Sequence, residues 1–143
     1  MDATMMNAQL TIDGLLNRAE SYFGDVEVVS QMPDKSLRRD TYADVGRRAR
    51  RLAKGLQHRG LEEGECVATL MWNHHAHMET YFGAPMAGGI YHTLNIRLSP
   101  DDLTYIVNNA EDRYLIVDDV LVPLLQKFID RIEVDEIFVV RLT

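Results

Sequence analysis

The stretch that decides the fold is residues 66–97, CVATLMWNHHAHMETYFGAPMAGGIYHTLNIR. Residues 66–72 form a nearly unbroken apolar run, which is typical of a strand covered on both faces, so we expect a central strand. Asn73 offers a side-chain oxygen at the start of a helix, and Pro85 should end or kink that helix before the glycine pair that follows. Residues 90–94 then predict a second strand. The stretch therefore predicts a strand-helix-strand unit.

Further elements are predicted on both sides of this unit. Thr41 and Asp44 have the spacing of a capping box, at the start of a helix that continues until Gly60. Ser99 before Pro100 is a second helix start. Other expected helices are residues 11–24 and 120–129, and other expected strands are residues 26–30, 36–39, 114–117 and 136–141. The two short strands before residue 40 should form a hairpin at an edge.

Strands and helices alternate from residue 66 onward, which favours right-handed crossovers and a parallel sheet. The predicted fold class is α/β, with a mostly parallel sheet, helices on both faces and a small N-terminal hairpin. We expect residues 1–24 to form an N-terminal arm and helix, and residues 25–143 to form the α/β portion. Residues 1–9 carry no strong pattern and are assigned to the arm.

Composition narrows the class of protein. A formal net charge of -7 argues against a nucleic-acid binder, because such binding relies on Lys and Arg neutralising phosphates. Cys66 is the single cysteine and cannot form an internal disulfide, and no apolar run reaches the roughly 20 residues of a membrane helix. A reducing, cytoplasmic setting and small-molecule or protein partners are expected. Peripheral association with a membrane is kept as an alternative to a purely cytoplasmic location.

Residues 71–119, MWNHHAHMETYFGAPMAGGIYHTLNIRLSPDDLTYIVNNAEDRYLIVDD, carry a long and specific pattern. It reads N-H-x-x-H-x-E-x-Y-F-x-x-P, then G-x-x-x-H-T-x-N-x-R-L-S, then N-x-A-E-D before a strand. This pattern resembles the N-terminal part of acyl-adenylate-forming enzymes, the AMP-dependent synthetase/ligase superfamily, and most closely the long-chain fatty acid CoA ligases. The resemblance extends upstream through TYADVGRRARRLAKGL. Ile96 departs from it, since the family commonly has proline in N-P-R-L.

The resemblance implies a parent enzyme that uses ATP and Mg²⁺ to activate a fatty acid as an acyl-adenylate and then transfers the acyl group to CoA. Such enzymes carry a Ser/Thr/Gly-rich phosphate loop, an adenine motif, a Mg²⁺ glutamate and a catalytic lysine, and none of these occurs in the 143 residues. We therefore expect an N-terminal fragment without catalytic residues, inactive by itself and without tight binding of ATP, Mg²⁺ or CoA. Pairing as a homodimer through N-terminal domains is also implied.

Arg97 is the one candidate for cofactor binding. A guanidinium on a loop at the carboxyl end of a strand can hold phosphate, and the resemblance places the matching arginine near the CoA phosphates. The alternative is a structural arginine paired with Asp101 or Asp102. His92 and Asn95 are weaker candidates for the same loop.

Other conspicuous side chains receive structural interpretations. Among His74, His75 and His77, only His74 and His77 have the spacing of two metal ligands on one helix face. These two have no committed third ligand, so no metal site is predicted, and packing and hydrogen bonding at the helix start are favoured. Cys66 is expected to be a small buried hydrophobe. The acid pair Asp118 and Asp119 could bind a metal or a ribose, but capping of the next helix is favoured. The basic helix, whose cations run from Arg47 to Arg59, is interpreted as a solvated face, with an anionic surface, nucleotide or acidic partner as the alternative.

Two kinds of alternative remain at this level. Within the superfamily, the parent could be an aryl or medium-chain acid CoA ligase, because the pocket that measures the acyl chain lies mostly downstream. Outside it, the chain could be a stand-alone α/β dimerisation module without chemistry, which pairs through its arm and first helix.

Overall fold

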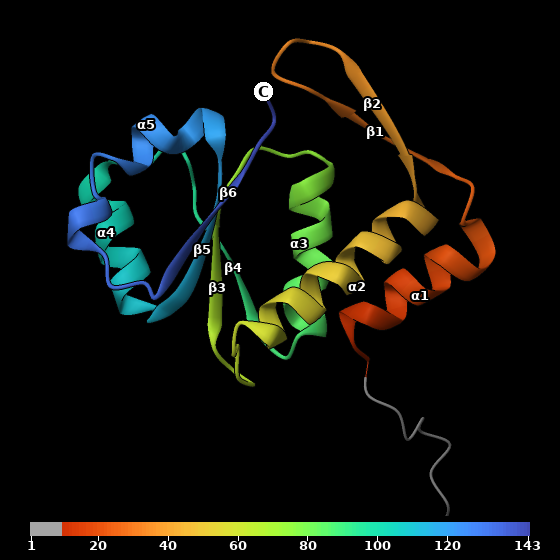
Figure 1. The fold of residues 1–143 in the computed structure, drawn as a ribbon, viewed down its shortest axis with the longest axis horizontal. Helices are drawn as coiled ribbons and strands as arrows, with labels where there is room; N and C mark the ends of the chain where they lie inside the picture. Colours follow the sequence, from red (N-terminus) through yellow and green to blue (C-terminus); the bar gives the residue numbers. More distant parts are fainter. Residues whose placement is uncertain (1–9) are drawn as a thin grey trace, which may run out of the picture.

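The structure, a computed structural model, describes residues 10–143. Five α-helices, six strands and two 3₁₀ turns follow one another in this part of the chain (Figure 1). In order they are α1 (Ile12–Phe23), β1 (Glu27–Gln31), β2 (Leu37–Thr41), α2 (Tyr42–His58), β3 (Cys66–Leu70), α3 (His75–Met86), β4 (Ile90–Thr93), α4 (Pro100–Asn109), β5 (Asp112–Asp118), η1 (Asp119–Leu121), α5 (Val122–Leu125), η2 (Ile129–Arg131) and β6 (Glu136–Val140).

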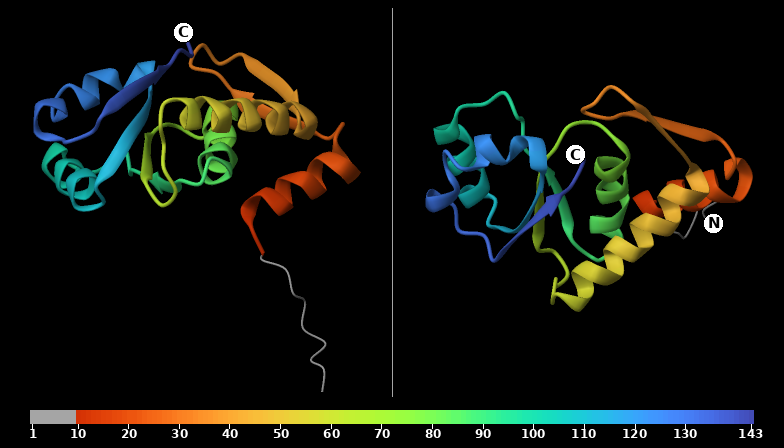
Figure 2. Two further views of the ribbon diagram at one scale, coloured as in Figure 1. Left: turned by 60° about the horizontal axis from the view of Figure 1, so that its bottom comes forward. Right: turned by 45° about the horizontal axis from the view of Figure 1, so that its top comes forward.

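The main sheet has four strands in the order β4-β3-β5-β6, and every neighbouring pair is parallel. Helices α2 and α3 cover one face, while α4 and α5 lie against the other (Figures 1 and 2). The predicted α/β class, parallel sheet and central position of β3 are confirmed. The expected arm, residues 1–9, lies outside the described residues.

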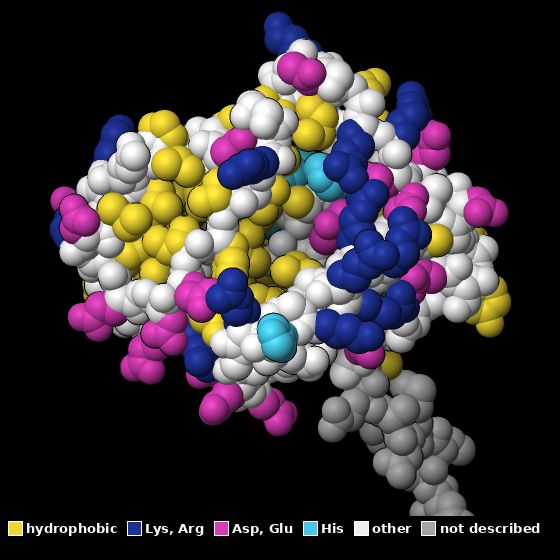
Figure 3. Space-filling view, in the orientation of Figure 1, with side chains coloured by type: hydrophobic (Ala, Val, Ile, Leu, Met, Phe, Trp, Pro, Cys, Tyr) yellow, Lys and Arg dark blue, Asp and Glu magenta, His cyan; other side chains and the backbone are white. Residues whose placement is uncertain are grey.

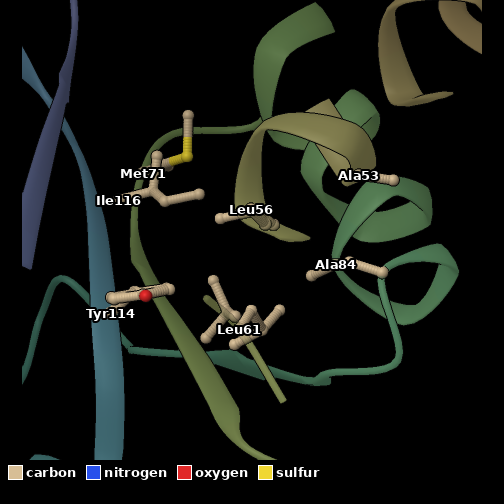
Figure 4. Packing of buried hydrophobic residues seen from close by; sticks show 9 residues of the cluster. Ala53, Leu56, Leu61, Met71, Ala84, Tyr114 and Ile116 are labelled. Atoms are coloured by element: carbon tan, nitrogen blue, oxygen red, sulfur yellow. The ribbon is translucent and has the colours of Figure 1, made fainter. Parts of the chain in front are cut away.

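The sheet separates two apolar cores, and β3 contributes to both. Val67 faces the α2 and α3 side, where it belongs to one apolar cluster with Leu56, Leu61 and Tyr114. Figure 4 shows these last three residues in the cluster. Ala68 faces the α4 and α5 side. Because successive side chains of a strand point to opposite faces, a strand buried on both faces needs an unbroken apolar run.

The hairpin of β1 and β2 does not join the main sheet, so the expectation that it lies at an edge is wrong. It forms its own antiparallel two-stranded sheet, with Ser30 opposite Arg38. The buried carboxylate of Asp40 accepts hydrogen bonds from Arg48 Nη2 at 2.8 Å and Arg38 Nε at 2.9 Å. An ion pair therefore ties the hairpin to α2.

Local signals set the start of α2 as predicted, but not the start of α3. The Thr41 hydroxyl accepts from Asp44 N, and the Asp44 carboxylate accepts from Thr41 N, which completes a capping box. For α3, the N-cap is His74, whose Nδ1 accepts from Ala76 N at 3.2 Å. The prediction that Asn73 caps this helix is wrong.

The helix expected at residues 120–129 is also wrong in extent. The chain forms the turn η1, the short helix α5 and the turn η2 instead. Phe128 leaves the helical region with φ -142 and is buried in the second core. Burial of this ring against the sheet overrides the helical pattern of the sequence.

Candidate functional site at the carboxyl edge of the sheet

The four parallel strands end at one edge, where ligands of open α/β sheets commonly bind. Several residues lie at or just beyond the ends of the four strands. They are Trp72, Asn73 and His74 after β3, Asn95 and Arg97 after β4, Asp118 at the end of β5 with Asp119 after it, and Leu142 and Thr143 after β6. The topology thus brings together most of the polar residues that the sequence singled out.

Arg97 lies exposed on the loop after β4. Its backbone N donates to Asn95 Oδ1 at 3.0 Å, which fixes the turn, while its guanidinium makes no ion pair within residues 10–143. Asp101 pairs with Arg131 instead, and Asp102 accepts from Ser99 Oγ at 2.7 Å. The structural alternative for Arg97, a pair with either acid, is therefore not found, and the guanidinium is available to an anion.

His92 does not line this loop, contrary to the sequence-based expectation. Its Nδ1 lies 2.8 Å and 2.9 Å from the two carboxylate oxygens of Asp112, which begins β5 at the opposite end of that strand. Burial raises the pKa of Asp112, and the contact with His92 opposes that rise. Asn95 alone remains beside Arg97.

The side chain of Asp118 does not cap the next helix but joins the end of β5 to the segment between β3 and α3, so that part of the capping interpretation is wrong. It is fully buried and accepts from Trp72 N at 2.8 Å and from His74 Nε2 at 2.9 Å. Because Nδ1 of His74 accepts from Ala76, its proton must lie on Nε2. Spacing in sequence could not reveal this pair, since 44 residues separate the two side chains.

Asp119 holds the chain that leaves β6. Its Oδ2 accepts from Leu142 N at 3.1 Å, from Thr143 N at 3.2 Å and from Thr143 Oγ1 at 2.7 Å, and its Oδ1 accepts from Val120 N. The hydrogen bond from the Thr143 side chain is the main reason that the pKa of Asp119 is lowered. Both acids are thus occupied by protein donors, which does not fit the metal or ribose alternative.

The three histidines have different surroundings. His77 Nε2 lies 3.1 Å from Thr69 Oγ1, whereas Nδ1 of His75 is buried and has no hydrogen-bond partner among residues 10–143. Burial is the main cause that lowers the pKa of His75 to about 4. No group of three His, Cys, Asp or Glu side chains within the described residues is placed to hold a metal ion.

Two further side-chain groups remain, and the first of them, Cys66, is only half-buried and not the buried hydrophobe expected from the sequence. Burial, followed by the charge of Asp112, raises the pKa of the half-buried Cys66 thiol, so it is not an activated nucleophile. On the basic helix, the guanidinium groups of four of the arginines form ion pairs, with Asp44, with Asp40 and Glu79, with Glu20, and with Glu136. Much of its charge is therefore balanced locally.

A groove of about 660 Å³ opens at the same edge, between the hairpin, α3 and β4. Its walls include the aromatic rings of Tyr81, Phe82 and Tyr91, with His77 beside them. Such a mostly apolar surface with a few polar groups is typical of a site for an organic ligand or for a further protein segment.

Comparisons with known proteins agree with this fold. The AMP-binding enzyme family matches residues 16–141, and the chain belongs to that family. It is 44% identical over 138 residues to a long-chain-fatty-acid–CoA ligase of Thermus thermophilus, which covers 96% of this chain and 26% of that protein. It is 38% identical over 121 residues to a medium-chain-fatty-acid–CoA ligase of Ectopseudomonas oleovorans, and this match covers 85% of this chain and 22% of that protein.

Solved structures show the same fold. A long-chain-fatty-acid-CoA ligase from Archaeoglobus fulgidus superposes with a TM-score of 0.79 at 18% identity, over 95% of this chain and 28% of that one. An anthranilate CoA ligase in complex with anthranoyl-AMP superposes with a TM-score of 0.77 at 25% identity, over 91% and 25%. The chain spans about a quarter of the length of these relatives. No helix within residues 10–143 is long and apolar enough to cross a membrane.

Proposed function

We propose that this chain forms part of the N-terminal domain of an ATP-dependent fatty acid CoA ligase, which converts acid, ATP and CoA into acyl-CoA, AMP and pyrophosphate. The observation that carries the proposal is the 44% identity, over 96% of the chain, to a protein described as a long-chain-fatty-acid–CoA ligase. The relative is about four times longer, so the chemistry is assigned to the whole protein and not to these residues.

Within that enzyme, Arg97 is proposed to hold a phosphate of CoA. Its guanidinium is exposed, makes no ion pair within the described residues and follows a strand at the ligand-binding edge. A guanidinium offers phosphate several donors in a fixed fork. The acids at the same edge are engaged by backbone donors and by His74, so Mg²⁺ and ATP are assigned to residues outside this chain.

The acyl chain length is a finer part of the proposal. Relatives include a medium-chain ligase, a 3-methylmercaptopropionyl-CoA ligase of Ruegeria lacuscaerulensis at 37% identity, and feruloyl-CoA synthase of Amycolatopsis at 40% identity over about half of the chain. We propose long-chain acids as the preferred substrates because the long-chain relative combines the highest of these identities with the widest coverage of this chain.

The test is acyl-CoA formation by the full product of the gene. Purified product is incubated with ATP, Mg²⁺, CoA and, in turn, butanoate, octanoate, hexadecanoate or benzoate, and acyl-CoA and pyrophosphate are measured. Preference for hexadecanoate supports the proposal, and preference for benzoate would replace it with an aryl ligase. The isolated 143-residue chain should release no acid-dependent pyrophosphate.

A second candidate, a non-catalytic dimerisation module, is favoured by one observation. Helix α1 exposes large apolar side chains, among them Leu15 with 65% and Tyr22 with 73% of their surface in solvent. We propose homodimer formation through this helix in either case. The mass of the natively expressed product separates the candidates, because a module would stay near 16.3 kDa and a ligase would be several times heavier.

We also propose a cytoplasmic location. Ion pairs balance much of the charge on α2, which leaves a weaker electrostatic attraction to anionic membranes than the sequence suggests. Cosedimentation with anionic vesicles tests this, and salt-sensitive binding through α2 would instead favour a peripheral location.

A further inference from the structure

Two buried pairs of an aspartate with a histidine mark the two ends of β5. At the carboxyl end, His74 Nε2 lies 2.9 Å from Asp118 Oδ2, and at the amino end, His92 Nδ1 lies 2.8 Å from Asp112 Oδ2. Asp118 is 0% and Asp112 is 1% exposed. The two pairs are alike in chemistry, but only the first lies at the carboxyl edge, where ligands bind in sheets of this kind. The second is therefore a reference for what the first adds.

Asp118 binds the segment that leaves β3. Its Oδ2 accepts a hydrogen bond from Trp72 N at 2.8 Å, and its two oxygens lie 2.9 and 3.0 Å from His74 Nε2. One carboxylate thus holds the 72–74 segment (Trp72, Asn73 and His74) at both of its ends. The row of Lys and Arg side chains along α2, visible in Figure 3, takes no part in these contacts. Hydrogen bonds to a charged acceptor are strong, so the segment is tightly restricted.

His74 serves two partners at once. Its Nδ1 accepts from Ala76 N at 3.2 Å and so caps α3, while its Nε2 donates to Asp118. A neutral imidazole has one acceptor nitrogen and one donor nitrogen, and both are used here. The usual N-cap residues are Ser, Thr, Asp and Asn, which would serve the helix alone. A histidine at this position therefore ties the start of α3 to the end of β5.

The side chains that this contact presents lie at the surface. Trp72 is 50% exposed, although its backbone N–H is bound by a buried carboxylate, and Asn73 is exposed. Asn73 lines the groove of about 660 Å³ and also a smaller cavity of about 400 Å³, which Trp72 lines as well. The 72–74 segment therefore separates two hollows at the carboxyl edge, and its position affects the shape of both.

The same segment is a neighbour of the loop that carries Arg97. Strand β3 lies between β4 and β5, and Thr69 O near the end of β3 accepts from Leu94 N, where the chain leaves β4, at 2.9 Å. The 72–74 segment thus lies between the Arg97 loop and Asp118. A ligand that is held by Arg97 and extends across the edge would meet this segment first.

We propose that the buried pair of Asp118 with His74 is a positioning unit, which fixes the 72–74 segment so that Trp72 forms one side of the CoA site beside Arg97. Neither member of the pair touches the ligand, and each acts through Trp72. This role rests on the proposed function, since CoA is the substrate assigned to Arg97. The pair of Asp112 with His92 has no such segment to hold and contributes to stability alone.

The first test measures the segment itself in the full product of the gene. His74→Asn keeps an N-cap for α3 but removes the imidazole that donates to Asp118. Amide hydrogen exchange at Trp72 should become about tenfold faster, as the loss of a charge-assisted hydrogen bond predicts. His92→Asn is the matched control, because it removes the imidazole of the other buried pair and should leave exchange at Trp72 unchanged. Unchanged exchange in His74→Asn would overturn the proposal.

The second test separates positioning from stability. His74→Asn should raise the KM for CoA by about fivefold or more, while kcat and the KM values for ATP and the acid change by less than about twofold. Trp72→Ala should have the same effect, and the double variant should add nothing to it, because the pair acts through Trp72. His92→Asn should lower the melting temperature but not change the KM for CoA.

Additive effects of the Trp72 and His74 variants, or equal KM changes in His74→Asn and His92→Asn, would overturn the positioning role. Asp118→Asn provides a second variant of the pair and should raise the KM for CoA in the same selective way. A wild-type product that forms no acyl-CoA would instead refute the proposed function, and with it the contact of Trp72 with CoA. Hydrogen exchange would still decide whether the pair fixes the segment, because it requires no ligase activity.

Discussion

At the scale of single residues, burial decides which polar side chains are available to a ligand. His74 and His92 look like candidate site residues in sequence, yet each is engaged by a buried carboxylate, Asp118 or Asp112. Arg97 looks equally able to pair with a nearby acid, yet its guanidinium has no such partner within the described residues. Arg97, the candidate for phosphate binding, is therefore the residue whose charged group has no ion-pair partner within the described residues.

Arg97 carries the first prediction. In the full gene product, Arg97→Ala should raise the KM for CoA by about tenfold, since a charged hydrogen bond to phosphate contributes about 1.5–3 kcal/mol. The KM for ATP and for the acid should change little, and Arg97→Lys should recover part of the loss. Steady-state kinetics with each substrate varied in turn checks this. Lys127→Ala, another exposed cation, is the control, and an unchanged KM for CoA would refute the assignment.

His75 carries a prediction about pH. Its pKa is lowered from 6.5 to about 4 by burial, so below pH 6.5 the unfolded chain binds a proton that the folded chain does not. Stability should fall as the pH drops from about 6.5 toward 4, by up to about 3 kcal/mol from this group. Urea unfolding at pH 7.5 and pH 5 measures it. His75→Phe should reduce the slope, and an equal slope in the variant would contradict the prediction.

At the scale of elements, the close contact of α2 with α3 depends on the lack of a side chain at Gly83. A Cβ at Gly83 would lie 2.9 Å from the backbone oxygen of Ala49 and 3.0 Å from Leu52 Cδ2. Glycine here lets α3 approach α2 closely, which positions both helices over the sheet. The same two helices, with β6, line a groove of about 630 Å³.

Two glycines should therefore respond in opposite ways. Gly83→Ala should destabilise the chain by about 1–3 kcal/mol, because overpacking outweighs the better helix propensity of alanine. Gly55→Ala, in an open position of α2, should stabilise it by up to about 1 kcal/mol. Thermal and urea unfolding of both variants provide the comparison. Stabilisation by both substitutions would show that α3 moves away at little cost.

At the scale of the whole molecule, apolar surface remains on the outside in places that suggest further contacts. The groove between α2, α3 and β6 is one such place, and the outer side of α1 is another. Leu15 and Tyr22 are seven residues apart, share one side of this helix and are exposed to solvent, whereas the neighbouring Leu16 is buried. Surface of this kind favours association.

The last prediction concerns that association. Leu15→Glu should shift the chain from dimer toward monomer, lowering dimer affinity by about tenfold or more because a charge would enter an apolar interface. Sedimentation velocity over a range of protein concentrations measures the shift. Leu37→Glu, at an exposed apolar position of the hairpin, is the control. A wild-type chain that is monomeric at every concentration would refute pairing through α1.

The sequence alone determined the order and type of most elements, since short-range signals govern them. The apolar run of β3, the capping box of α2 and the Ser99-Pro100 start of α4 each depend on neighbouring residues. The family also follows from the sequence, because its motif is long and continuous. Only the tertiary structure decided which polar groups are satisfied: the pairs of Asp118 with His74, Asp119 with Thr143 and Asp112 with His92 join residues 20 or more positions apart. The separate hairpin and the shortened α5 were settled in the same way, by packing against surfaces that no local pattern describes.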